Sequence, residues 1–343
     1  MSSLAQWLTA VWYGDRAPGL GLRALAALYG GVSGLRRAAY RRGWLRRERV
    51  GAPVLVVGNL TVGGSGKTPL VIALVEHLAQ AGWSPGVVSR GYGRRSRGLV
   101  EVGVDTEPAA GGDEPVLIAR RTGVPVVVAA DRVAAARRAV ALGCDIVIAD
   151  DGLQHARLHR ELEIEVVDAQ RGYGNGRLLP AGPLREPPRA GIDLRVLHRS
   201  AVAGDGGDDE PAFVLAGDDL HAADGRREPL ASWRRRRVHA LAGIGHPRRF
   251  FERLRAAGLE VIEHPFTDHH AYVADNLHFA ERLPIVMTEK DWVKCAALAP
   301  ADSWYLPVQA RCTPSLLARV DALLASRALA PARIDAQQHR GSA

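Results

Sequence analysis

Residues 56–69, VVGNLTVGGSGKTP, have the types and spacing of a phosphate-binding loop. The glycines free backbone N–H groups to face phosphate oxygens, Lys67 can reach the β- and γ-phosphates, and Thr68 can hold Mg²⁺. The usual pattern G-x-x-x-x-G-K-[ST] begins with a glycine where this chain has Thr61, which is tolerable if the backbone keeps a negative φ there. The predicted nucleotide-binding residues are Thr61, Gly63, Gly64, Ser65, Gly66, Lys67 and Thr68.

Two adjacent carboxylates, Asp150 and Asp151, follow the apolar run IVIA. A P-loop needs an acid at the end of a neighbouring strand to organise its metal ion. Two neighbouring carboxylates behind a buried strand repel each other, and a cation would relieve that repulsion. The sequence therefore predicts that these acids take part in a metal site.

Phosphoryl transfer to a hydroxyl also needs a group that accepts the proton and a cation that holds the charge on the phosphate. The segment Gly-Asp113-Glu114-Pro puts two carboxylates in a loop framed by glycine and proline, which suits a base. The segment GPLREP presents Arg185 in a rigid turn. Without further context, these three are also compatible with ordinary loop residues.

The elements that must position these groups alternate as in a parallel α/β sheet. Strands are predicted at 53–58, 86–89, 124–128, 145–149 and 164–167, with helices at 67–81 and after Asp131, a predicted N-cap. The acidic stretch 203–211, AGDGGDDEP, is the predicted boundary to a second, smaller α/β unit. The predicted organisation is an N-terminal segment at 1–50, a P-loop kinase-like unit at 51–205, a smaller closing unit at 206–330 and a flexible tail at 331–343.

Composition limits the class of protein. The chain has 343 residues, of which 47% are hydrophobic and 24% charged, so a wholly disordered protein is excluded. Three cysteines without close spacing favour a reducing compartment. The net charge of +8 calls for an anionic partner, which could be nucleic acid, anionic lipid or a phosphorylated substrate.

The N-terminal segment predicts attachment to a membrane surface. An apolar stretch, residues 19–35, precedes RRAAYRRGWLRRER, in which arginines alternate with interfacial aromatic residues. The stretch carries Arg23 and is too short to cross a bilayer, so it would lie on the membrane. A solvated basic helix is the alternative interpretation.

Eight motifs occur along the chain in one order: VGNLTVGGSGKTP, SRGYGR, GDEP, ADDGLQH, LLPAGPLREP, AGIGHPRRFF, FTDHHAY and TEKDWVK. From about residue 20 to 320 the chain resembles the tetraacyldisaccharide 4′-kinase family of lipid A biosynthesis. The resemblance implies transfer of the γ-phosphate of ATP to the 4′-hydroxyl of a tetraacylated glucosamine disaccharide 1-phosphate, with ATP and Mg²⁺ as cofactors.

The resemblance also implies roles for individual residues. Asp113 would be the base and His269 its partner, with the adjacent His270 as the alternative. Closure of the two units would then complete the site and exclude water. The further implied residues are Lys67, Asp151 and Arg185 in catalysis, Thr68, Asp150 and Glu114 at the metal, Tyr92, Arg90 and His155 at the disaccharide, and Thr288, Lys290 and Asp291 as groups closing over the nucleotide.

The resemblance implies a peripheral enzyme at the cytoplasmic face of the inner membrane, with no nucleic acid and no obligate protein partner. Two alternatives remain open from the residues themselves. One is a membrane-associated P-loop NTPase that acts as a switch, and the other is a soluble small-molecule kinase. A nucleic-acid-binding ATPase ranks last, because only the high pI suggests it.

Overall fold

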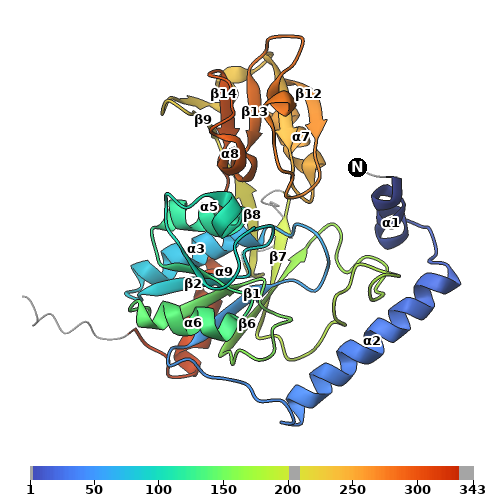
Figure 1. Cartoon of the computed structure of the whole chain (residues 1–343), viewed down its shortest axis with the longest axis vertical. Coiled ribbons are helices and arrows are strands. Elements are labelled where there is room, and N and C mark those ends of the chain that lie inside the picture. Colours follow the sequence, from blue (N-terminus) through green and yellow to red (C-terminus); the bar gives the residue numbers. More distant parts are fainter. Residues whose placement is uncertain (1–2, 201–208, 332–343) are drawn as a thin grey trace, which may run out of the picture.

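The computed structural model describes residues 3–200 and 209–331 (Figure 1). Most of the predicted boundary stretch and almost all of the predicted tail lie outside the described residues. The described chain forms two sheets with their helices and, ahead of them, two N-terminal helices. The fold is therefore α/β with a larger and a smaller unit, as the sequence predicted.

The larger unit is built on a mostly parallel sheet. Its strands are β1 (Val54–Gly58), β2 (Pro85–Ser89), β3 (Val100–Val102), β4 (Val126–Val128), β5 (Ile146–Asp150), β6 (Leu162–Asp168), β7 (Leu194–Arg199), β8 (Ala212–Ala216) and β15 (Gln309–Cys312). They lie in the order β15-β8-β7-β6-β1-β5-β2-β4-β3. The edge pairs β3–β4 and β15–β8 are antiparallel, and the other pairs in this order are parallel. Strand β1, which leads into the P-loop, is thus central and lies next to β5, which ends at Asp150.

Helices cover both faces of this sheet. They are α3 (Lys67–Gln80), α4 (Pro108–Gly111), α5 (Asp113–Thr122), α6 (Arg132–Ala141) and α9 (Pro314–Ser326). Side chains of β1 alternate between two cores: Leu55 packs with residues of α3, α5 and α9, whereas Val56 packs with residues of α6. Asp131 accepts hydrogen bonds from the backbone N–H groups of Val133 and Ala134, so the predicted N-cap is confirmed.

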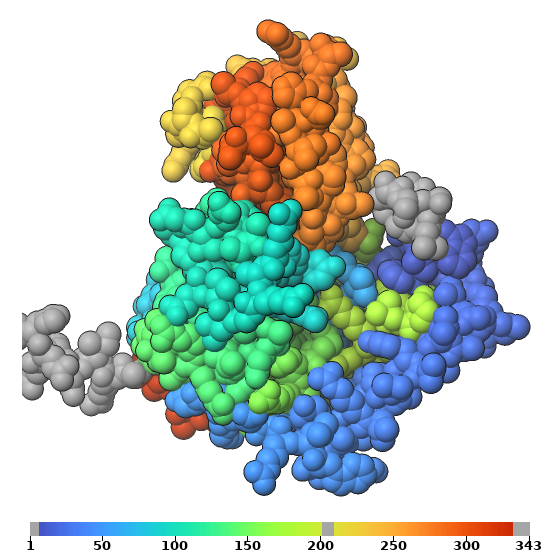
Figure 2. All heavy atoms as spheres, viewed as in Figure 1, coloured from blue at the N-terminus to red at the C-terminus, as the bar shows by residue number. Residues whose placement is uncertain are grey.

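The smaller unit has its own sheet and core. Its elements are β9 (Asp219–Ala222), β10 (Arg227–Pro229), η1 (Leu230–Trp233), β11 (Arg237–Ala242), α7 (Pro247–Ala256), β12 (Glu260–Pro265), η2 (Ala274–Leu277), β13 (Ile285–Thr288), α8 (Glu289–Cys295) and β14 (Ser303–Leu306). The strand order is β10-β9-β14-β13-β11-β12. Figure 2 shows this unit standing on the larger one above the segment that contains α5.

The units divide differently from the predicted ranges. Within the range assigned to the smaller unit, β8, β15 and α9 belong to the larger one: β8 and β15 extend its sheet, and Phe213 and Leu316 lie in its core. The chain therefore passes between the units twice, after β8 and before β15. Strand pairing over almost a hundred residues depends on tertiary contacts, which local sequence patterns do not carry.

The N-terminal segment forms α1 (Ser3–Tyr13) and α2 (Leu20–Arg41), and α2 runs along the outside of the larger unit (Figure 1). Ala26 faces the protein and is buried, whereas Leu25, Leu28, Val32 and Leu35 are exposed by 55–67%. These four residues, the apolar face of α2, lie on one side of the helix by their spacing. None of the helices in the described part of the chain is long and apolar enough to cross a membrane.

Candidate active site

The P-loop has the backbone that its glycines predict. Gly63 and Gly66 have φ values of 113° and 78°, in the region that favours glycine, and Gly66 is the N-cap of α3. Among the described residues, those other than glycine with positive φ do not include Thr61. Thr61 instead pairs with Leu184 in an antiparallel bridge and accepts a hydrogen bond from the side chain of Asn59. The condition for threonine at this position is met.

Lys67 connects the P-loop with the acids at the end of β5. Its Nζ lies 2.9 Å from Oδ1 of Asn59 and 3.4 Å from Oδ1 of Asp151. Arg185 donates to Oδ2 of Asp151 at 2.8 Å. Burial would raise the pKa of Asp151, but Lys67 and Arg185 hold it at about 2. Asp151 is thus a fixed anion that orients two cations, and its φ of 51° shows a backbone held in an uncommon conformation.

Asp150 has the opposite environment. It is 1% exposed, its Oδ1 has no hydrogen-bond partner, and burial together with the charge of Glu114 raises its pKa to about 7. Thr68 is also buried, at the start of α3. Mg²⁺ prefers such oxygen donors, so these residues fit the ion. Among the described residues no group of three or more His, Cys, Asp or Glu side chains is arranged around a metal position, and Glu114 is bound to Lys290.

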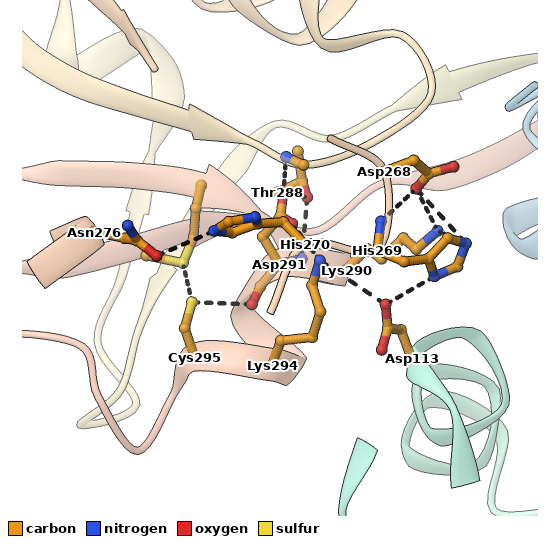
Figure 3. Close-up of polar contacts among 12 residues, drawn as sticks. Asp113, Asp268, His269, His270, Asn276, Thr288, Lys290, Asp291, Lys294 and Cys295 are labelled. Atoms are coloured by element: carbon orange, nitrogen blue, oxygen red, sulfur yellow. Dashed lines mark hydrogen bonds and ion pairs between the residues drawn. The ribbon is translucent and has the colours of Figure 1, made fainter. Parts of the chain in front are cut away.

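Asp113 and His269 come from different units and are in direct contact (Figure 3). His269 Nδ1 and Asp113 Oδ2 are 3.1 Å apart. Asp113 is the first residue of α5 and does not lie in a loop, because Pro115 falls in the first turn, where proline fits a helix. The charge of Lys67 reaches Glu114, so the P-loop and the start of α5 face one site.

The two adjacent histidines have separate environments. His270 lies 3.1 Å from the side-chain oxygen of Asn276 and packs against the rings of Phe266 and Tyr272. His269 has a φ of 58° and faces Asp113. The structure therefore brings His269, and not His270, to the candidate base.

The residues predicted at the disaccharide differ in exposure, and among them Tyr92 contacts His269. Tyr92 is 66% exposed, and its ring centroid is 4.7 Å from that of His269. Arg90 is exposed just after β2. Nε2 of His155 is buried without a hydrogen-bond partner, and burial with the charge of Arg132 lowers the pKa of His155 to about 4.

Sequence reasoning did not select several residues that line the same centre. Asn59 and Gln154 are part of the hydrogen-bond network of Lys67 and Arg185. Lys294, from α8, has its Nζ 3.8 Å from Oδ2 of Asp113. The motifs VGNLT, ADDGLQH and TEKDWVK contain these residues, so their positions within the motifs were the available signal.

The chain matches the family model described as tetraacyldisaccharide-1-P 4′-kinase over residues 19–325. The chain belongs to the tetraacyldisaccharide 4′-kinase family. It is 55% identical over 309 residues to the tetraacyldisaccharide 4′-kinase of Xanthomonas euvesicatoria, covering 87% of this chain and 89% of that protein. It is 53% identical to the enzyme of Stenotrophomonas maltophilia, covering 88% and 91%.

A solved structure of this kinase family has the same fold. The "apo" form of LpxK from Aquifex aeolicus, in complex with ATP, matches with a TM-score of 0.71 and 29% identity, covering 88% of this chain and 97% of that one. The predicted fold class and the resemblance to the tetraacyldisaccharide 4′-kinase family are therefore confirmed.

Proposed function

We propose that this protein transfers the γ-phosphate of ATP to the 4′-hydroxyl of a tetraacyldisaccharide 1-phosphate, the kinase step of lipid A biosynthesis that gives lipid IVA. Membership of the tetraacyldisaccharide 4′-kinase family supports the reaction. The observation that carries it is the contact of Asp113 with His269 beside a P-loop. A carboxylate oriented by histidine suits an alcohol acceptor, because the hydroxyl must lose a proton as it attacks.

The roles follow from the charges on the described side chains. Asp113 accepts the proton of the 4′-hydroxyl, and His269 orients the carboxylate through Nδ1. Lys67 and Arg185, held by Asp151, face the charge that builds up on the transferring phosphoryl group. Tyr92 and Arg90 are exposed beside His269 and after β2, where they can contact the disaccharide, and His155 is a further candidate for that contact.

Mg²⁺ would be held by Thr68 and Asp150, with Glu114 as a further ligand. When bound, the ion neutralises charge on the β- and γ-phosphates. The unpartnered oxygen of Asp150 supports this assignment, because a buried carboxylate oxygen without a donor is costly unless a cation satisfies it. Lys290 binds Oε1 of Glu114, so a metal ligand role for Glu114 would fall to its other carboxylate oxygen, with the Lys290 contact kept.

The enzyme would sit on the cytoplasmic face of the inner membrane through its N-terminal segment. The apolar face of α2 is exposed, and Trp44 and Leu45 after the helix are exposed as well. Arg42 lies over the ring of Trp44, at 5.3 Å, as expected for an interfacial pair of a basic and an aromatic residue. An acylated substrate held in a bilayer requires such an attachment.

The test is mass spectrometry of the lipid after incubation with ATP and the purified protein. A mass gain of one phosphate on the distal sugar is expected, and Asp113→Ala should lower turnover by about 10²–10⁴-fold with little change in the KM for ATP. ATP consumption without a phosphorylated lipid would favour the NTPase switch. Full activity of residues 50–343 on a soluble acceptor without detergent would favour the soluble kinase.

A further inference from the structure

We propose that Lys290 is a positioning residue that holds Asp113 and His269 together from the smaller unit. The proposal rests on the proposed function, because it assumes that these two residues act as base and partner. Lys290 lies in the first turn of α8, which faces α5 across the boundary between the units (Figure 3).

The ammonium group of Lys290 contacts both sides of the pair. Its Nζ lies 2.9 Å from Oε1 of Glu114, 3.0 Å from Oδ1 of Asp268 and 3.4 Å from Nε2 of His269. Glu114 follows Asp113 in α5, and Asp268 precedes His269 in the loop after β12. One cation therefore ties together the two carboxylates that flank the base and its partner in sequence.

This contact also fixes the backbone of His269. The φ of 58° is uncommon for histidine and persists only where neighbouring groups hold it. Oδ1 of Asp268, the atom bound by Lys290, accepts a hydrogen bond from the backbone N–H of His269 at 3.1 Å. Without Lys290, the carboxylate of Asp268 loses its cation. His269 then loses one restraint on its backbone and one on Nε2 of its ring.

The start of α8, which carries Lys290, is held rigidly by hydrogen bonds. Asp291, with 0% exposure, accepts hydrogen bonds from the backbone N–H of Gly243 at 2.8 Å and from Oγ1 of Thr288 at 2.6 Å. Thr288 in turn caps α8 by accepting from the backbone N–H of Asp291. The start of α8 is thus tied to β11 and β13, so the position of Lys290 is set by the sheet of the smaller unit.

Charge and burial both favour a fixed ammonium group. The side chain of Lys290 is 14% exposed. Burial would lower its pKa, but Glu114 and Asp268 raise it above the ordinary value. The cation therefore stays charged, and removing it leaves two partly buried carboxylates without their cation beside the reaction centre.

A second ion pair on the same two helices provides a matched control. Arg121, in the last turn of α5, donates from Nη1 to both carboxylate oxygens of Glu289, at 3.1 and 3.0 Å. The side chains of Arg121 and Glu289 are 19% and 12% exposed, against 14% and 32% for Lys290 and Glu114, but the control pair lies at the opposite end of α5 from Asp113. Lys290→Met and Arg121→Met each remove an ion pair between the units. Only Lys290→Met removes contacts with Glu114 and Asp268, the sequence neighbours of the base and its partner.

The experiment compares full-length variants by lipid phosphorylation and thermal unfolding. We expect Lys290→Met to lower kcat about 10²-fold with the KM for ATP unchanged, as for a misplaced catalytic group. Lys290→Arg should restore part of kcat, and Arg121→Met should stay within about threefold of wild type. The thermal unfolding midpoint shows whether Lys290→Met still folds. If it does not, the kcat of Lys290→Arg is used for the test.

The decisive measurement is a double-mutant cycle with His269→Ala. If Lys290 acts through His269, adding Lys290→Met to His269→Ala lowers kcat by less than about threefold. Multiplicative losses in the double variant, or equal losses in Lys290→Met and Arg121→Met, would overturn the proposal. A wild-type protein that produces no phosphorylated lipid would instead refute the proposed function.

Discussion

Replacing Asp150 with asparagine tests the electrostatics of the metal-free site. Asp150 is almost fully buried, and one carboxylate oxygen has no donor. Burial, with the charge of Glu114, raises its pKa from 3.8 to about 7. Asparagine keeps the shape of the side chain and removes the charge, so the substitution isolates the effect of ionisation.

The direction follows from proton binding. The folded protein keeps a proton on Asp150 that the unfolded chain releases between about pH 4 and pH 7, so the free energy of unfolding falls as pH rises through this window. A shift of about three pKa units corresponds to about 4 kcal/mol above pH 7. Asparagine recovers only roughly 2 kcal/mol of this, because its own buried amide lacks partners and costs about 1–3 kcal/mol.

Thermal unfolding in the presence of EDTA measures the effect. At pH 8 we expect the midpoint of Asp150→Asn to exceed that of wild type by about 3 °C, and at pH 5 we expect the gain to be largely lost. Groups distant from Asp150 titrate alike in both proteins, so the difference between the two midpoints reports Asp150 together with the carboxylates whose charges act on it. Adding MgATP should stabilise wild type more than the variant. An equal difference at both pH values, or a less stable variant at pH 8, would refute the reasoning.

Two further predictions concern α2. Tyr29→Phe deletes the 2.8 Å hydrogen bond from the Tyr29 hydroxyl to the backbone oxygen of Arg185, and kcat should fall about fivefold, while flotation with vesicles is unchanged. Leu28→Asp introduces a charge on the apolar face of α2, and partition into vesicles should fall roughly 10–100-fold in flotation, while turnover of a detergent-dispersed acceptor stays near wild type. Unchanged kcat in the first variant, or unchanged flotation in the second, would contradict these assignments.

The parts of the fold that are determined by local sequence could be predicted. The P-loop, its strand and its helix follow from the spacing of glycines, Lys67 and the apolar residues, and β5 follows from four apolar residues before two acids. The N-cap at Asp131 follows from the preference of that side chain for free N–H groups. Each of these depends on residues only a few positions apart.

The parts that depend on distant contacts could not be predicted from spacing. The pairing of β8 with β15 joins segments almost a hundred residues apart, so the boundary between the units was misplaced. His269 contacts Asp113 of the larger unit, whereas His270 contacts Asn276 of its own unit. The sequence around the two histidines does not show this difference. The position of Lys290 in the sequence does not predict its contacts with Glu114 and Asp268, because these two carboxylates come from different segments.

The threonine that departs from the usual P-loop pattern has a structural reason in this fold. The bridge of Thr61 with Leu184 is flanked by hydrogen bonds from the backbone N–H of Arg185 to the oxygen of Leu60, at 2.7 Å, and from that of Val62 to the oxygen of Pro183, at 2.9 Å. The entrance of the P-loop is therefore held by an isolated antiparallel bridge, which positions the segment carrying Arg185. A glycine would weaken this pairing through its greater backbone freedom, whereas β-branched threonine favours the extended conformation. The departure thus joins the phosphate-binding loop to the segment of Arg185, the arginine proposed to neutralise the transferring phosphoryl group.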